Sequence, residues 1–124
     1  MAFAFVFPGQ GSQSLKMMDG FAGHPVVRAT FDEAGDALGL DLWAMLQAES
    51  AEAINQTVNT QPLMLAAGVA IWRAWLAAGG QRPAAVAGHS LGEYSALVAA
   101  GSLAFADAVR LVRLRAEAMQ GAVP

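Results

Sequence analysis

Cysteine is absent from this 124-residue chain. Its absence excludes a disulfide scaffold, a metal site built from thiolates and a cysteine nucleophile. Charged residues are also few, at 14%, and the formal net charge at pH 7 is −3. A nucleic-acid-binding protein neutralises phosphates with a basic stripe, so this charge balance argues against a nucleic-acid partner.

Long hydrophobic runs are missing as well. The longest apolar stretch, residues 63–78, contains Arg73 and falls short of the roughly 20 residues that a membrane-spanning helix needs. The apolar start, residues 1–7, has no Lys or Arg before it and ends at Pro8, which is too early for a secretory signal peptide. We therefore expect a cytoplasmic protein with no membrane partner and no metal site.

Hydrophobic residues nevertheless make up 56% of the chain, which is above the roughly 45–50% of an ordinary domain. This composition excludes a disordered chain, and the length fits one small domain. The excess of apolar residues means either that the domain is unusually buried or that part of its surface meets a partner or further chain.

Short apolar runs alternate with helical patterns, which predicts an α/β fold with a parallel sheet flanked by helices. The expected strands are residues 2–7 and 84–87, and the first strand is apolar on both faces, as expected of a strand that helices cover on each side. Thr60 is the expected N-cap of the most apolar helix, and Pro62 its first turn. Helices are expected over residues 25–38, 63–78, 93–100 and 105–119, with shorter helical pieces at 42–48 and 51–56.

The turn after the second expected strand reads Gly88-His89-Ser90-Leu91-Gly92. Between a strand and a helix, G-x-S-x-G predicts a nucleophile elbow, a strained turn that raises the serine hydroxyl above the sheet. Gly88 and Gly92 are needed because larger side chains would clash where the helix crosses the strand. The N–H of Leu91, directly after the nucleophile, is the expected oxyanion donor. The alternative is an ordinary tight turn in which Ser90 only caps the helix.

A nucleophilic serine needs a base, and the chain has only 2 histidines. Neighbouring side chains on such a turn diverge, so we expect His89 to pack beneath the elbow and hydrogen-bond to backbone rather than serve Ser90. His24 lies at an expected helix start, where a capping or surface role is the favoured interpretation. The catalytic triad is therefore incomplete within these residues.

Arg115 is the unusual residue of the last expected helix, because at ~100° per residue it falls within the apolar stripe. An unpaired buried charge is costly, so Arg115 needs a carboxylate or several acceptors. An acidic residue can supply this, or the side chain can extend to solvent; alternatively, the partner is a ligand carboxylate, which would select a substrate with a free acid. The stripe is made of Ala108, Leu111, Val112 and Met119, and the opposite face of Arg110, Arg113 and Glu117.

The motifs in these segments resemble those of the malonyl-CoA:acyl carrier protein transacylases and of the acyltransferase domains of fatty-acid and polyketide synthases. The resemblance implies an α/β-hydrolase-like core that moves a malonyl group from coenzyme A to the phosphopantetheine thiol of acyl carrier protein, through an acyl-serine, in fatty-acid biosynthesis. It implies no cofactor, because the phosphopantetheine belongs to the partner. The matching segments are FVFPGQGSQ at 5–13, TQP at 60–62, AGHSLGEYSALVAAG at 87–101 and FADAVRLVRLR at 105–115.

The resemblance also implies roles for individual residues. Ser90 would be the nucleophile that becomes acylated, and Arg115 would bind the malonyl carboxylate. The backbone N–H groups of Gln10 and Leu91 would form the oxyanion hole. Gln61 belongs to a shared motif, and we expect it only to support the pocket wall.

Some parts that the resemblance implies lie outside residues 1–124: the catalytic histidine, a later glutamine linked to it, and a small ferredoxin-like subdomain. We therefore expect residues 1–124 to be the N-terminal portion of the large α/β acyltransferase domain, inactive without the remainder of the enzyme. Two alternatives stay open. One is a serine esterase or thioesterase of the α/β-hydrolase type, which explains the elbow but not PGQGSQ or Arg115; the other is a non-catalytic fragment.

Overall fold

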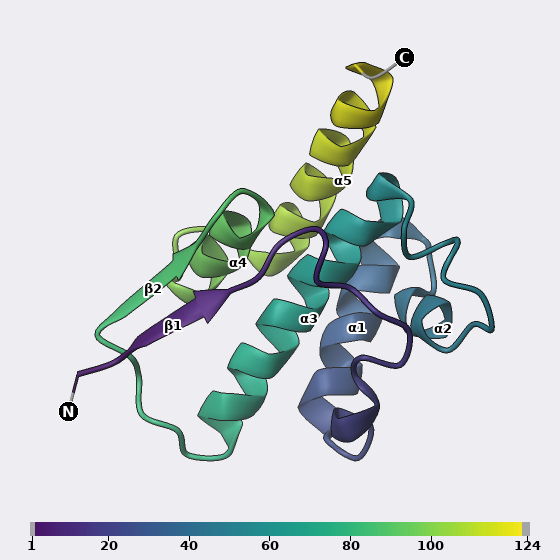
Figure 1. Ribbon diagram of the computed structural model, residues 1–124. Coiled ribbons are helices and arrows are strands. Elements are labelled where there is room, and N and C mark those ends of the chain that lie inside the picture. Colours follow the sequence, from purple (N-terminus) through teal and green to yellow (C-terminus); the bar gives the residue numbers. More distant parts are fainter. Residues whose placement is uncertain (1, 123–124) are drawn as a thin grey trace.

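Strands β1 (Ala4–Phe7) and β2 (Ala85–Gly88) lie side by side in the computed structural model of the protein, which describes residues 2–122. They pair in parallel, with Ala4 opposite Ala85 and Phe7 opposite Gly88. Parallel pairing puts the carboxyl ends of both strands at one edge, so the loop after β1 and the turn after β2 leave the sheet together (Figure 1). The predicted α/β class with a parallel sheet is confirmed.

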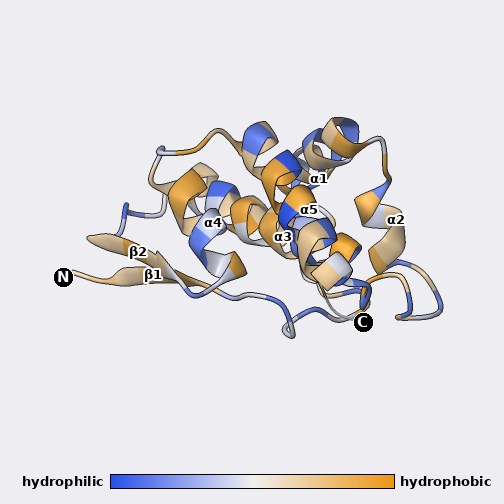
Figure 2. Ribbon diagram, turned by 90° about the horizontal axis from the view of Figure 1, so that it is seen from above, coloured by the Kyte–Doolittle hydropathy of each residue, from blue (hydrophilic) through white to orange (hydrophobic). Residues whose placement is uncertain are grey.

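Helices make up most of the remaining described chain. Helices α3 and α4 pack on one face of the sheet, and α5 and α1 pack on α3 (Figure 2). Residues 51–56, predicted as a short helix, form turns instead. The helical elements are η1 (Asp19–Phe21, a 3₁₀ helix), α1 (Pro25–Leu38), α2 (Leu42–Leu46), α3 (Thr57–Ala77), α4 (Leu91–Ala99) and α5 (Phe105–Ala122).

The other face of the sheet is uncovered within residues 2–122. Ala4, Ala85 and Ala87 are exposed there, and Val6 is 69% exposed. The prediction of helices on both sides of the first strand is therefore wrong for the described chain, because no described element crosses this face. The sequence pattern of β1 is that of a fully buried strand, and this face is where its apolar side chains reach solvent.

Helix α3 is the central helix, and every residue from 59 to 70 is buried. It begins at Thr57, before the predicted N-cap, Thr60. The Thr60 hydroxyl therefore lies inside the helix, and it donates hydrogen bonds to the Ile54 and Gln56 carbonyls. Pro62 therefore lies within the helix rather than in its first turn. Since proline has no N–H, the Val58 carbonyl lacks its usual donor four residues on.

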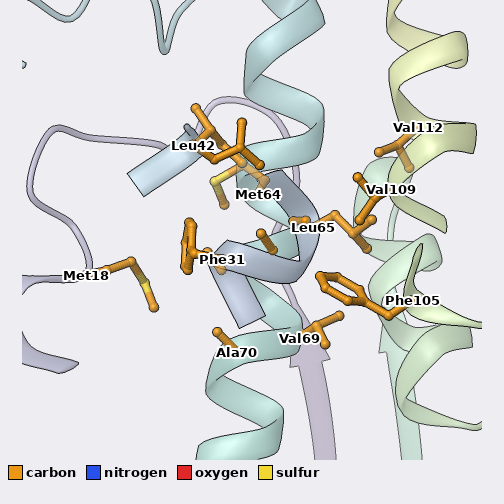
Figure 3. Packing of buried hydrophobic residues seen from close by; sticks show 14 of the residues in the cluster. Met18, Phe31, Leu42, Met64, Leu65, Val69, Ala70, Phe105, Val109 and Val112 are labelled. Carbon is orange, nitrogen blue, oxygen red and sulfur yellow. The ribbon is translucent and has the colours of Figure 1, made fainter. Parts of the chain in front are cut away.

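Two apolar clusters hold the helices together. The larger lies where α1, α3 and α5 meet and includes Phe31, Leu65 and Val109 (Figure 3). The smaller lies between the sheet, α3 and α4 and includes Phe7 and Trp72. The buried side of α5 differs from the predicted stripe, since Leu111 and Met119 are each 42% exposed. The buried residues of α5 are Phe105, Ala108, Val109, Val112 and Ala116.

Helix α4 starts at a backbone contact that leaves no room for a side chain. A Cβ atom on Gly92 would overlap the carbonyl group of Phe7, at the end of β1, and a Cβ on Gly88 would overlap the carbonyl group of Gly92. The clash that the sequence predicts for larger residues is therefore present at both positions. Ser90 lies between them with φ 56° and ψ −118°, a backbone conformation that costs a non-glycine residue roughly 1–3 kcal/mol.

We expect Gly92→Ala to lower the free energy of unfolding by about 1–3 kcal/mol or more, because the added methyl group displaces α4 from the end of β1. Gly121→Ala is the matched control, since a Cβ at Gly121 meets nothing within 4 Å; it should change stability by less than about 0.5 kcal/mol. Urea unfolding of both variants measures the difference. A Gly92→Ala variant as stable as the control would contradict this packing.

Candidate active site

The Ser90 hydroxyl and the Arg115 guanidinium lie side by side. Ser90 immediately precedes α4, and Arg115 lies in the second half of α5. Arg115 Nη2 donates a hydrogen bond to Ser90 Oγ at 3.0 Å. Ser90 is exposed and Arg115 is half-buried, so both groups can be reached from solvent. A nucleophile candidate and a cation therefore share one accessible site.

Gln61 holds the other arm of this guanidinium. Its side chain is fully buried in α3, and its Oε1 accepts a hydrogen bond from Arg115 Nη1 at 2.7 Å. Its Nε2 donates to the Met119 sulfur at 3.3 Å. The Tyr94 ring lies 5.6 Å from Arg115 Cζ, at a distance typical of a cation–π contact. Gln61 thus contacts the site directly, whereas the sequence predicts only a supporting residue in the wall.

Every partner of Arg115 within residues 2–122 is electrically neutral. The ion pairs in that part of the chain join other arginines to nearby carboxylates, and Arg115 takes part in none of them. An acidic partner within the described residues, one of the alternatives for Arg115, is therefore excluded. A half-buried charge held only by neutral groups attracts an anionic ligand. The paired arginines are Arg28, Arg73, Arg110 and Arg113.

The loop after β1 packs against the elbow. A Cβ on Gly9 would lie 3.4 Å from the His89 carbonyl oxygen and 3.7 Å from Leu91 Cβ, so Gln10 follows at the same edge of the sheet. Leu91 is the first residue of α4, and its N–H has no acceptor within the helix. The Gln10 N–H makes no hydrogen bond to backbone within residues 2–122. Both N–H groups thus lie beside the elbow without a backbone acceptor in the part of the chain that the structure describes.

No histidine of the described chain serves Ser90. The only side-chain hydrogen bond to Ser90 Oγ within residues 2–122 comes from Arg115. His89 is exposed, so the prediction that it packs beneath the elbow is wrong; the diverging turn points it to solvent. His24 is the N-cap residue of α1, makes no capping hydrogen bond with its side chain, and lies near the Phe21 ring.

Arg113 faces the protein rather than solvent, contrary to prediction. Its Nη1 donates to the Val58 carbonyl at 2.8 Å and to Asn59 Oδ1 at 3.0 Å. The Val58 carbonyl is the one that Pro62 leaves without a helical donor, so Arg113 replaces the missing N–H. This contact ties α5 to the start of α3, close to Gln61.

Neither Ser90 nor Arg115 lines either of two further pockets. One of about 500 Å³, between α1 and α2, includes Asp32, Asp36 and Asp41 in its lining. The other, of about 310 Å³, is an apolar groove between β2 and α4 with Val86 and Leu97 in its wall. Within residues 2–122, no three metal-binding side chains come together, and no helix has both the length and the apolar character to span a bilayer.

Comparison with known proteins places the chain in a family. Residues 4–124 match the family described as acyl transferase domain, and the chain belongs to it. A protein of Salmonella typhimurium named malonyl CoA-acyl carrier protein transacylase is 60% identical over 123 residues, which is 98% of this chain and 40% of that protein. One of the same name from Escherichia coli is 59% identical with the same coverage.

Solved structures agree with this assignment. An acyl-carrier-protein S-malonyltransferase of Burkholderia pseudomallei superposes with a TM-score of 0.97 at 61% identity, over 100% of this chain and 40% of that one. A malonyl-transacylase in complex with its type II polyketide acyl-carrier protein gives a TM-score of 0.96 at 58% identity, with the same coverage. The chain thus spans about 40% of the length of the relatives it matches.

We expect Arg113→Met to lower the free energy of unfolding by about 1–3 kcal/mol, because it leaves the Val58 carbonyl and Asn59 without their donor. Arg110→Met is the control, since Arg110 is 59% exposed and its one ion pair among residues 2–122 is with Asp107; an exposed pair of this kind contributes about 0.2–1 kcal/mol. Denaturant midpoints of the two variants make the comparison. Equal losses would mean that Arg113 is only a surface residue.

Proposed function

We propose that residues 1–124 form the N-terminal portion of the large α/β domain of a cytoplasmic malonyl-CoA:acyl carrier protein S-acyltransferase. The fraction of the relatives' length that the chain spans supports this, as does the uncovered apolar face of its sheet. On this proposal the remaining portion supplies a histidine base for Ser90. The isolated chain is then inactive, and the complete enzyme needs no metal or cofactor of its own.

In the proposed reaction the Ser90 oxygen attacks the thioester carbonyl of malonyl-CoA while the base accepts the hydroxyl proton. The tetrahedral intermediate collapses when the carbon–sulfur bond breaks, and coenzyme A leaves as its thiol with that proton. The phosphopantetheine thiol of acyl carrier protein then attacks the malonyl-serine ester, gives its proton to the base, and receives the malonyl group. Ser90 regains its proton from the same base.

The N–H groups of Gln10 and Leu91 are proposed to stabilise the oxyanion in both steps. Leu91 is the first residue of α4, so the positive end of the helix dipole adds to its N–H. Gln10 follows Gly9, whose backbone lies against the elbow. A donor of this kind contributes about 3–4 kcal/mol in comparable sites.

The observation behind the malonyl specificity is the charge of Arg115 beside Ser90, held by Gln61 and without a carboxylate partner in the described chain. A malonyl group bound to Ser90 would bring its free carboxylate to this guanidinium. An acetyl group would leave the charge unpaired, so acid-bearing acyl groups are favoured. An esterase or thioesterase offers no comparable reason for Arg115 at this position.

We expect Ser90→Ala to abolish formation of the malonyl-enzyme, because the nucleophile is removed. The assay is intact-mass spectrometry with malonyl-CoA, on this chain joined to the C-terminal portion of the Salmonella typhimurium relative. Ser102→Ala, at an exposed serine, should label normally. Label retained by Ser90→Ala would move the nucleophile elsewhere, and rapid hydrolysis of the ester with no transfer to a thiol would indicate the hydrolase alternative.

We expect Arg115→Ala to lower malonyl transfer by at least about a hundredfold, equivalent to about 2.7 kcal/mol, with a much smaller loss of acetyl transfer. Measurement of kcat/KM for both acyl groups, in the same joined chain, gives the selectivity. Arg110→Ala is the control because Arg110 is exposed. Equal losses for the two acyl groups would make Arg115 a structural residue.

A further inference from the structure

The loop between β1 and the first helical turn contains a hydrogen-bonded bridge that the proposed mechanism does not use. The Gln13 side chain accepts a hydrogen bond from the Gly11 N–H at 2.8 Å through its Oε1. Its Nε2 donates to Asn55 Oδ1 at 3.0 Å. One amide side chain therefore links the loop to a residue 42 positions further along the chain.

The bridge closes the loop around Gln10. On its N-terminal side, Gly9 lies against the elbow. On its C-terminal side, Gly11 has φ 108°, a conformation that L side chains rarely adopt, and the Gln13 carbonyl oxygen Oε1 holds its N–H. The peptide group that contains the Gln10 N–H is thus held between two fixed neighbours. Besides this bridge, the turn bond from the Ser12 N–H to the Gly9 carbonyl, at 3.3 Å, holds the part of the loop around Gln10, and further along the loop the Lys16 N–H donates to the Leu46 carbonyl at 2.8 Å.

The far end of the bridge lies beside the element that supports Arg115. Asn55 belongs to the turns that lead into α3, and its own N–H donates to the Ala51 carbonyl at 3.1 Å. Helix α3 then contains Gln61, which holds the Arg115 guanidinium. Through Asn55, the Gln10 loop is therefore linked to the turn that leads into the helix on which Gln61 holds Arg115.

We propose that Gln13 is a positioning residue for the oxyanion hole: its side-chain amide, braced by Asn55, fixes the peptide of Gln10 so that its N–H points at the oxyanion. This inference rests on the proposed function. Gln13 touches no reacting atom. Loss of the bridge frees the next peptide, which contains the Gly11 N–H, and leaves the peptide of the Gln10 N–H held by the long turn bond to the Gly9 carbonyl. A donor that must first be ordered stabilises the transition state less.

The test is Gln13→Leu in the chain joined to the C-terminal portion of the Salmonella typhimurium relative. We expect kcat to fall about tenfold, less than the ~10²–10³ that loss of an oxyanion donor costs, with KM unchanged. The loss should be the same for malonyl and acetyl transfer, because both form an oxyanion. Gln120→Leu is the control, since Gln120 is an exposed glutamine and should retain full activity.

A double-mutant cycle tests the bracing by Asn55. Asn55→Ala removes one end of the bridge and leaves the Gly11 bond, so we expect about a threefold loss alone and no further loss in the Gln13→Leu background. Asn55→Asp keeps an acceptor for Gln13 Nε2 and should restore most of the rate. We expect every variant to have the same melting temperature as the parent.

Three results would overturn the proposal: a Gln13→Leu variant within twofold of the parent, a loss confined to malonyl transfer, or full additivity of Gln13→Leu and Asn55→Ala. Failure of the proposed function gives a different result from failure of this inference. In that case the unmodified joined chain forms no malonyl-serine at all, whereas failure of this inference alone leaves malonyl transfer intact in the unmodified joined chain.

Discussion

The contact between Gly92 and the Phe7 carbonyl is the constraint on which the rest of the site depends. It sets the start of α4 directly on the end of β1, and the second close approach, of Gly88 to Gly92, turns the chain sharply between β2 and the helix. Ser90 takes a strained backbone conformation as a result. The same packing brings Gly9 against the elbow. The loop after β1 therefore lies close to the first N–H group of α4.

The second determinant is a positive charge without a negative partner. Arg115 is oriented by the Gln61 oxygen and the Tyr94 ring, and it donates to Ser90 Oγ. Orientation by neutral groups leaves the charge itself uncompensated, and an incoming carboxylate supplies the missing ion pair at little reorganisation cost. A carboxylate from the protein would instead satisfy the guanidinium and weaken its hold on a substrate. On the proposed function, this difference separates malonyl from acetyl groups.

Much of this arrangement follows from the sequence, because local backbone chemistry decides it. The strand–turn–helix order and the glycine spacing predict the elbow, and helical periodicity already separates Arg115 from the polar face of α5. Long-range partners are not encoded locally, so the Gln61 hydrogen bond and the inward-facing Arg113 escape prediction. Pro62 predicts a start of α3 that is too late. The proline is tolerated inside the helix because Arg113, 55 positions after Val58, donates a hydrogen bond to the Val58 carbonyl, which proline leaves without a donor. The bare face of β1 also differs from prediction, because its apolar pattern is that of a strand covered on both faces while no described element crosses this face.

A crystal structure of the malonyl-enzyme would show whether Arg115 binds the carboxylate of the acyl group, with this chain joined to the C-terminal portion of the Salmonella typhimurium relative and a base-deficient variant used to trap the ester. We expect electron density for a malonyl group on Ser90 Oγ, with its free carboxylate paired to the Arg115 guanidinium and its ester carbonyl facing the Gln10 and Leu91 N–H groups. A malonyl carboxylate that points to solvent or to another cation, with Arg115 still bound to Ser90, would contradict this expectation.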